Sequence, residues 1–270
     1  MGRIISLVSG KGGVGKTTIT ANLGIALAKR NLKVCLIDAD VAMANLSLLL
    51  NMQSSPITLH DVLLGESNIL DAIYDGPHGL KFIPSGLSLE SYRRVDTERL
   101  SSVIESIANQ FDFILLDAPA GIEKNVMSAM HASDEVLLIT MPTSPAVADV
   151  LKAKLVAQRI GIRTTGVVIN FFRGEKGEIS KDDIMRMLEL PVFGIIPFDD
   201  EVRKSFMQQK VAPVMLRKPK SPAAVAIQKT AAKLAGIPTK FNETKKEGFL
   251  SRILSKLFGK KKNPEEQVRK

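Results

Sequence analysis

A glycine-rich loop between a predicted strand and a predicted helix is the feature that most constrains this chain. The loop follows the apolar run Arg3–Ser9 and consists of Gly10, Lys11, Gly12, Gly13, Val14, Gly15, Lys16, Thr17 and Thr18. It fits the phosphate-binding pattern G-x-x-x-x-G-K-[ST] in the strand, loop and helix context that this pattern needs. Glycines let backbone N–H groups converge on phosphate oxygens, and a helix N-terminus favours negative charge. We therefore expect Lys16 to neutralise the β and γ phosphates of a nucleotide and Thr17 to bind Mg²⁺.

Apolar runs and helix-periodic segments alternate along the chain. The strand-like runs are Arg3–Ser9, Lys33–Asp38, Leu80–Pro84, Phe113–Asp117, Glu135–Thr140, Thr165–Asn170 and Val192–Pro197. The helix-periodic segments are Lys16–Arg30, Asp96–Asn109, Ser144–Arg159, Asp200–Gln209 and Ser221–Ala235. This alternation predicts an α/β fold with a doubly wound, mainly parallel sheet of the P-loop NTPase kind. Ligands of such sheets bind beyond the carboxyl ends of the strands.

The glycine spacing also fits a different class of protein. Gly10, Gly12 and Gly15 satisfy G-x-G-x-x-G, and Asp38 ends the second predicted strand, where dinucleotide-binding enzymes hold a ribose. A dinucleotide site does not need a lysine that binds phosphate directly after its last glycine. Lys16 and Thr17 therefore favour a nucleoside triphosphate.

Carboxylates follow two of the predicted strands. Phe113–Asp117 is an apolar run that ends in an aspartate, which is typical of the residue that helps to hold Mg²⁺ beside a phosphate-binding loop. Asp38 and Asp40 follow the second predicted strand, and capping of a turn is the structural alternative for both.

A second lysine, Lys11, stands one residue after the first loop glycine. With it, the segment Lys-Gly-Gly-Val-Gly-Lys-Thr resembles the deviant-Walker ATPases of the MinD/ParA family. The resemblance implies that Lys11 reaches across a dimer to the partner's phosphates, as an arginine finger does. It also implies slow, Mg²⁺-dependent hydrolysis of ATP that is activated by dimerisation and by a partner.

The resemblance assigns catalytic and metal-binding roles to the residues above. Asp40 is expected to orient or deprotonate the attacking water, and Asp38 to support the Mg²⁺ shell. The expected catalytic residues are Lys11, Lys16 and Asp40. The expected metal-binding residues are Thr17, Asp38, Asp40 and Asp117.

Other positions match the family at the dimer face and around the base. Asn45 is expected at the dimer face, and Gly121 and Glu123 in a switch segment that changes when the γ-phosphate is lost. Asn170 and Pro197 end two later strands and match positions that hold adenine in the family. Ordinary strand-end turns are the alternative for these last two residues.

Composition excludes several classes of function. Only 5% of the residues are aromatic, which leaves few platforms for stacking on single-stranded nucleic acid. The single cysteine, Cys35, can form neither an internal disulfide nor a Cys-x-x-Cys metal site. No apolar stretch approaches the ~20 residues that a membrane-spanning helix needs, and no signal peptide opens the chain. We therefore expect a cytoplasmic protein.

The basic charge is concentrated in the last part of the chain. The formal net charge is +9, and residues 240–270 hold ten Lys or Arg against four Glu. We predict an ATPase domain at 1–238, a linker at 239–247, an amphipathic helix with a lysine cluster at 248–262 and a polar tail at 263–270. One half of the predicted helix carries Phe249, Leu250, Ile253, Leu254, Leu257 and Phe258.

A basic amphipathic helix of this kind can lie in a membrane interface, and it resembles the C-terminal targeting helix of MinD-type family members. We therefore expect an ATP-dependent homodimer on the inner face of the cell membrane that acts as a spatial regulator, with an activator and a cargo protein. We do not expect nucleic acid as a partner. The alternatives are a flagellar-placement ATPase, a ParA-like DNA or cargo partitioning ATPase, and a non-enzymatic adaptor. Ala44 and Ser47 depart from the bacterial division-type pattern, so its usual partners do not carry over.

Overall fold

The structure is a computed structural model that describes residues 2–40, 45–52, 55–86, 99–207 and 211–238. One compact unit spans Met1–Ile237. The predicted linker, amphipathic helix and polar tail, and with them the six expected membrane-binding side chains, lie outside the described residues. No helix among the described residues is long and apolar enough to cross a membrane.

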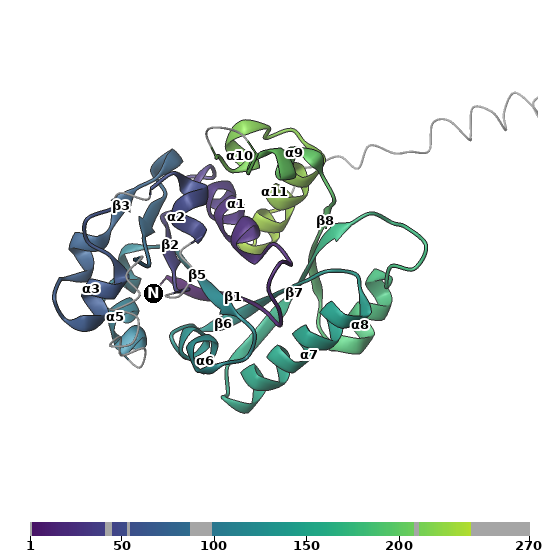
Figure 1. Cartoon of the computed structure of the whole chain (residues 1–270), viewed down its shortest axis with the longest axis horizontal. Helices are drawn as coiled ribbons and strands as arrows, with labels where there is room; N and C mark the ends of the chain where they lie inside the picture. The colour runs from purple at the N-terminus through teal and green to yellow at the C-terminus, as the bar shows by residue number, and fades with distance from the viewer. Residues whose placement is uncertain (1, 41–44, 53–54, 87–98, 208–210, 239–270) are drawn as a thin grey trace, which may run out of the picture. The chain divides into compact units, whose positions relative to one another are not determined.

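An eight-stranded sheet forms the centre of this unit (Figure 1). Its strands are β1 (Arg3–Ser9), β2 (Val34–Asp38), β3 (Tyr74–Asp75), β4 (Lys81–Ile83), β5 (Phe113–Ala120), β6 (Glu135–Thr140), β7 (Arg163–Phe172) and β8 (Val192–Pro197). Their order is β3-β4-β2-β5-β1-β6-β7-β8, and all neighbours pair in parallel except β3 with β4. This confirms the predicted mainly parallel, doubly wound sheet.

Helices cover both faces of the sheet (Figure 1). One face is covered by α1 (Lys16–Ala28), α2 (Asn45–Leu50), α10 (Val214–Arg217) and α11 (Pro222–Leu234). The other is covered by α3 (Leu59–Leu64), α5 (Leu100–Glu105), α6 (Lys124–His131), α7 (Ser144–Arg159) and α8 (Lys181–Leu188). A short helix, α9 (Asp200–Lys204), follows β8. Successive residues of β1 enter opposite layers, with Ile5 and Leu7 in one and Ile4 and Val8 in the other, because side chains alternate along a strand.

Two predicted helices are shorter among the described residues, which leave out 96–98 and 208–210. The segment expected to be helical from Asp96 to Asn109 contains α5 and then a 3-10 turn at Ala108–Gln110. The hydroxyl groups of Ser102 and Ser106 donate to the carbonyls of Arg99 and Val103, and such local bonds compete with a continuous helix. The helix expected to reach Gln209 ends at Lys204. The antiparallel strand β3 and the helices α2, α3, α6, α8 and α10 were not predicted, because each is short.

Candidate functional site

A cavity of about 490 Å³ lies over the phosphate-binding loop, beyond the carboxyl ends of β1, β2 and β5. It is lined by Ser9, Lys11, Gly12, Gly13, Val14, Gly15, Lys16, Thr17, Thr18, Asp40, Asn45, Leu48, Ala120, Phe171 and Phe206. All the predicted phosphate-binding residues except Gly10 therefore meet in one cavity, together with Asp40 and Asn45 from the segment after β2. This is the place where parallel α/β sheets bind ligands.

The loop backbone has the shape of an anion cradle. Gly15 has φ 86° and precedes the first residue of α1, a conformation that side-chain-bearing residues rarely adopt. A Cβ atom added to Gly12 or Gly13 would meet no atom within 4 Å, so the space above these residues is open to a ligand. The N-terminus of α1 points its unpaired N–H groups at the same space. The loop therefore fits a polyphosphate.

A buried ion pair joins the loop to β5. Lys16 Nζ lies 2.7 Å from Asp117 Oδ1, and the two residues are only 7% and 1% exposed. The hydroxyl of Thr20, one turn further along α1, donates to the same oxygen at 2.9 Å. Thr20 was not among the predicted site residues, although its place one turn after Lys16 on the same helix could have indicated it. Asp117 therefore fixes the position of the lysine ammonium.

Asp38 and Asp117 are direct neighbours in the sheet. They occupy partner positions on the parallel strands β2 and β5, which brings two buried carboxylates side by side. Burial raises the pKa of Asp38 well above its usual range, the charge of Asp117 raises it further, and Lys16 acts in the opposite direction. The charge of Asp40 also raises this pKa, and a cation beside the carboxylates would act in the opposite direction.

The backbone after β2 is held by the Asp38 carboxylate. One oxygen accepts the N–H of Asp40 at 3.2 Å, and the other accepts the N–H of Leu46 at 3.1 Å. Residues 41–44 lie outside the described residues, but Asp40 and Asn45 on either side of them both line the cavity. Asp38 therefore holds the backbone of this segment on its buried side, while Asp40 lines the cavity.

The predicted switch segment follows β5 at the rim of the same site. The N–H of Gly121 donates to the carbonyl of Ser9 at 3.0 Å, which ties the segment to the start of the phosphate-binding loop. Ile122 is 42% exposed, and Glu123 is exposed and occupies the N-cap position of α6 without a capping hydrogen bond from its side chain. Glu123 does not line the cavity. Its place in the switch remains a prediction.

The two expected adenine-binding residues lie near the carboxyl ends of β7 and β8. Asn170 is buried, and its amide nitrogen donates to the carbonyl of Val14 at 2.8 Å, so it braces the loop itself. Pro197 ends β8 beside Phe172 of β7. Neither residue lines the cavity, whereas Phe171, which follows Asn170, does so. Phe171 was not among the predicted site residues, although an aromatic residue directly after a predicted strand-end asparagine could have indicated it.

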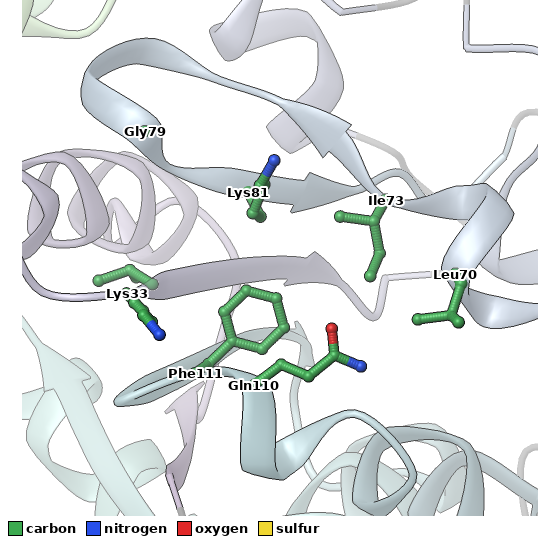
Figure 2. A pocket seen from close by; sticks show the side chains of 8 residues that line it. Lys33, Leu70, Ile73, Gly79, Lys81, Gln110 and Phe111 are labelled. Carbon is green, nitrogen blue, oxygen red and sulfur yellow. The ribbon is translucent and has the colours of Figure 1, made fainter.

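A larger cavity, of about 720 Å³, lies at the other end of the strands, near the amino ends of β2 and β4. Phe111, Gln110 and Ile73 converge on it from facing segments, with Lys33 and Lys81 at its sides (Figure 2). The ammonium of Lys81 pairs with Asp75 at 2.5 Å. None of the predicted site residues that the structure describes borders this cavity, and it faces the amino ends of β2 and β4. The smaller cavity is therefore the candidate site.

The residues around the phosphate-binding loop fit Mg²⁺ with a nucleotide. Mg²⁺ in such sites keeps several waters and takes only one or two protein oxygens besides the phosphates. Thr17 lines the cavity, and the buried carboxylates of Asp38 and Asp117 lie beneath it. Within the described part of the chain, no group of three or more His, Cys, Asp or Glu side chains forms a metal cage of its own. The arrangement suits a metal held mainly by phosphate.

Comparisons with known proteins agree with this site. Residues 5–212 match the CobQ/CobB/MinD/ParA nucleotide binding domain. An ATP-binding protein of Methanocaldococcus jannaschii is 41% identical over 258 residues, which cover 95% of this chain and 97% of that protein. The septum site-determining protein MinD of Synechocystis is 34% identical, over 96% of this chain and all of that protein. The solved structure of MinD complexed with Mg-ADP from Pyrococcus horikoshii superposes with a TM-score of 0.83 at 38% identity, over 89% of this chain and all of that one.

Proposed function

The chain belongs to the CobQ/CobB/MinD/ParA family and is an ATPase of its MinD/ParA type, and from this premise we propose that it is an ATP-dependent dimeric switch that works on an anionic membrane surface. The observation that carries the proposal is the single cavity lined by Lys11, Lys16 and Asp40. In this cavity Lys16 would bind the phosphates of the chain's own nucleotide, Lys11 would bind those of a partner, and Asp40 would bind the attacking water.

Each side chain has a distinct part in the proposed hydrolysis. The loop N–H groups and Lys16 hold the β and γ phosphates, and the buried pair with Asp117 fixes the lysine in place. Thr17 supplies a hydroxyl to Mg²⁺, which when bound neutralises charge on the phosphates. Asp40 orients a water molecule and accepts its proton as the oxygen attacks the γ-phosphorus; ADP leaves and phosphate is released.

Dimerisation through the nucleotide face is the second part of the proposal. Lys11 lies in the loop at the edge of the cavity, and the rim carries the apolar side chains of Leu48 and Phe206, which are 45% and 47% exposed. Ile122 adds a third exposed apolar side chain in the neighbouring switch segment. Apolar groups gathered around a polar cavity are typical of a surface that a partner covers. A second copy on this face would bring its own Lys11 to the phosphates.

Membrane binding is the third part, and it rests on the sequence of residues 248–262. A lone amphipathic helix binds a membrane weakly, because ordering the chain offsets much of the gain from burying apolar side chains. Two such helices on one dimer bind together, since the second is held near the surface once the first has bound. ATP, by driving dimerisation, would thereby control residence on the membrane. The protein would act as a spatial regulator whose partners are an activator and a cargo protein.

The first experiment is co-sedimentation with liposomes that contain anionic lipid. The full chain is compared in ADP, in ATP and in a non-hydrolysable ATP analogue, and a variant that ends at Lys246 serves as the control. Pelleting is expected only with ATP or its analogue, and only with the full chain. Dimerisation is followed in parallel by light scattering.

The outcomes separate the proposal from its rivals. Confirmed ATP-dependent dimerisation with unchanged liposome binding contradicts the membrane switch. ATP-dependent retention on DNA at moderate salt, without pelleting, would instead favour a partitioning ATPase. Nucleotide binding without any turnover would favour a non-enzymatic adaptor.

A further inference from the structure

A buried histidine lies outside the phosphate-binding loop and has no role in the mechanism above. His60, in the first turn of α3, is 2% exposed. Its Nδ1 forms a short contact with the carbonyl oxygen of Ser85. A carbonyl oxygen can only accept, so Nδ1 carries the hydrogen. Among the described residues, Nε2 has no hydrogen-bond partner.

Burying Nε2 without a partner costs stability, so the hydrogen bond from Nδ1 is what favours a histidine at this position. A buried polar atom without a partner lowers the stability of the folded state. An apolar side chain such as leucine would fill much of the same space without leaving a nitrogen unpaired. What the imidazole adds here is the hydrogen bond to Ser85.

His60 also packs directly against the turn that follows β4. The backbone N–H groups of Leu59 and His60 donate to the carbonyls of Pro84 and Ser85 at 2.7 and 3.3 Å. Gly86 has φ 98°, and a Cβ atom on it would lie 2.6 Å from His60 Nδ1. The ring therefore occupies the space beside this turn, and both its Nδ1–H and the backbone N–H of His60 are directed at one carbonyl oxygen.

Ser85 connects this turn to the catalytic segment. It is fully buried, and its hydroxyl donates to the carbonyl oxygen of Asp40 at 3.0 Å. The contact forms because β2 and β4 are parallel neighbours, with Ile37 opposite Ile83, so their following residues run side by side. A continuous path of two hydrogen bonds thus leads from His60 through Ser85 to Asp40.

We propose that His60 is a positioning residue for Asp40, and that it acts by fixing Ser85. Asp40 is held from one side by Asp38, which accepts its N–H, and from the other by Ser85, which donates to its carbonyl. The peptide groups before and after the Cα of Asp40 are therefore both held, which limits where the Asp40 carboxylate can lie. The inference rests on the proposed role of Asp40 in hydrolysis.

Two substitutions at His60 separate the hydrogen bond from the packing. In His60→Asn the amide nitrogen is bonded to Cγ, as Nδ1 is, so it can donate to Ser85. In His60→Leu the apolar bulk is kept and the donor is lost. Because a misplacement of about 1 Å in an active site can cost about 100-fold in rate, His60→Leu is expected to lower kcat by about 10-fold or more with KM for ATP unchanged. The kcat of His60→Asn is expected to stay within about 3-fold of that of the unchanged protein.

Ser85→Ala tests the second bond of the path. It should lower kcat as His60→Leu does. The kcat of the double variant should be little lower than that of either single variant, because both substitutions break the same path to Asp40. The exposed His131 on α6 provides the control, and His131→Ala should change nothing. Circular dichroism and thermal unfolding of each variant show whether it folds.

The experiment combines ATP turnover with hydrogen–deuterium exchange of the full chain without nucleotide. His60→Leu and Ser85→Ala should speed exchange at the Asp40 N–H, and His60→Asn should not. Equal kcat and equal exchange in folded His60→Leu would overturn the proposal, as would a loss of activity in His60→Asn equal to that in His60→Leu. If the unchanged protein hydrolyses no ATP, the proposed function fails, while the exchange comparison still decides whether His60 fixes this segment.

Discussion

Lys16 Nζ lies 2.7 Å from Asp117 Oδ1, and both side chains are almost wholly removed from solvent. The cation that we expect to hold phosphate and the carboxylate that we expect beside Mg²⁺ are therefore one electrostatic unit. Breaking a buried pair leaves an uncompensated charge, which costs more than the pair itself contributes. Substitutions of one or of both partners should therefore affect the free energy of unfolding and nucleotide binding differently.

Lys16→Ala should abolish ATP binding and also destabilise the nucleotide-free protein. Leaving Asp117 buried without its cation is expected to lower the free energy of unfolding by about 3–5 kcal/mol. In Lys16→Ala/Asp117→Asn the charge is gone, so stability should recover in large part while binding does not. Urea denaturation and titration with a fluorescent ATP analogue measure the two effects. A single variant as stable as the unchanged protein would contradict this account.

Asp40→Ala should preserve nucleotide binding and stop hydrolysis. Loss of a residue that orients and deprotonates water is expected to lower kcat by about 10²–10⁴-fold. Because ATP then persists, the dimer should accumulate and remain on anionic liposomes. Asp182→Ala, on the exposed surface of α8, is the matched control and should behave as the unchanged protein. A monomeric, membrane-free Asp40→Ala protein in ATP would count against the proposal.

Lys11→Ala should bind ATP but lose activity, because the proposed target of Lys11 is the nucleotide of the partner subunit. A mixing experiment tests this directly. In a mixed dimer of Lys11→Ala and Asp40→Ala chains, one of the two sites keeps both its own Asp40 and the partner's lysine, so mixing two inactive proteins should restore roughly a quarter of the activity in a two-fold symmetric dimer. No recovery despite confirmed exchange of subunits would show that Lys11 acts within its own chain. Lys176→Ala, in an exposed loop, is the control.

Asp38 should make the nucleotide-free protein lose stability as pH rises. Its pKa is raised in the folded state, chiefly by burial and then by the charge of Asp117. Between the pKa of the unfolded chain and this raised value, the folded state binds one more proton than the unfolded state. The free energy of unfolding therefore falls through this window by up to about 1.4 kcal/mol per pH unit for one group.

Asp38→Asn removes this titration and provides the reference. The stability of the unchanged protein minus that of Asp38→Asn should decrease as pH rises from acid towards neutral, as measured by urea denaturation at several pH values. A difference that is independent of pH, or that increases, would show that the pKa of Asp38 is not raised in the folded state. Mg-ATP should reduce the slope if a cation beside Asp38 and Asp117 offsets their charge.

Local sequence was sufficient for the parts of the site that are contiguous in the chain. The phosphate-binding loop is one run of nine residues, and its glycines, lysines and threonines carry their own conformational and chemical requirements. Three of the predicted strands, Arg3–Ser9, Glu135–Thr140 and Val192–Pro197, have the bounds that the structure shows. Short elements such as α3 and β3 escaped prediction because they span too few residues to show a period.

The fold class, the phosphate-binding loop and the charged residues around it could be predicted from local sequence, because they follow from periodicity and from chemistry within a few consecutive positions. The packing of the whole chain pairs Lys16 with Asp117, 101 residues away, and places Asp38 beside Asp117. It also connects His60 to Asp40 through Ser85. These relationships depend on strand order and register, which arise when the whole sheet packs, and no local pattern encodes which strands become neighbours.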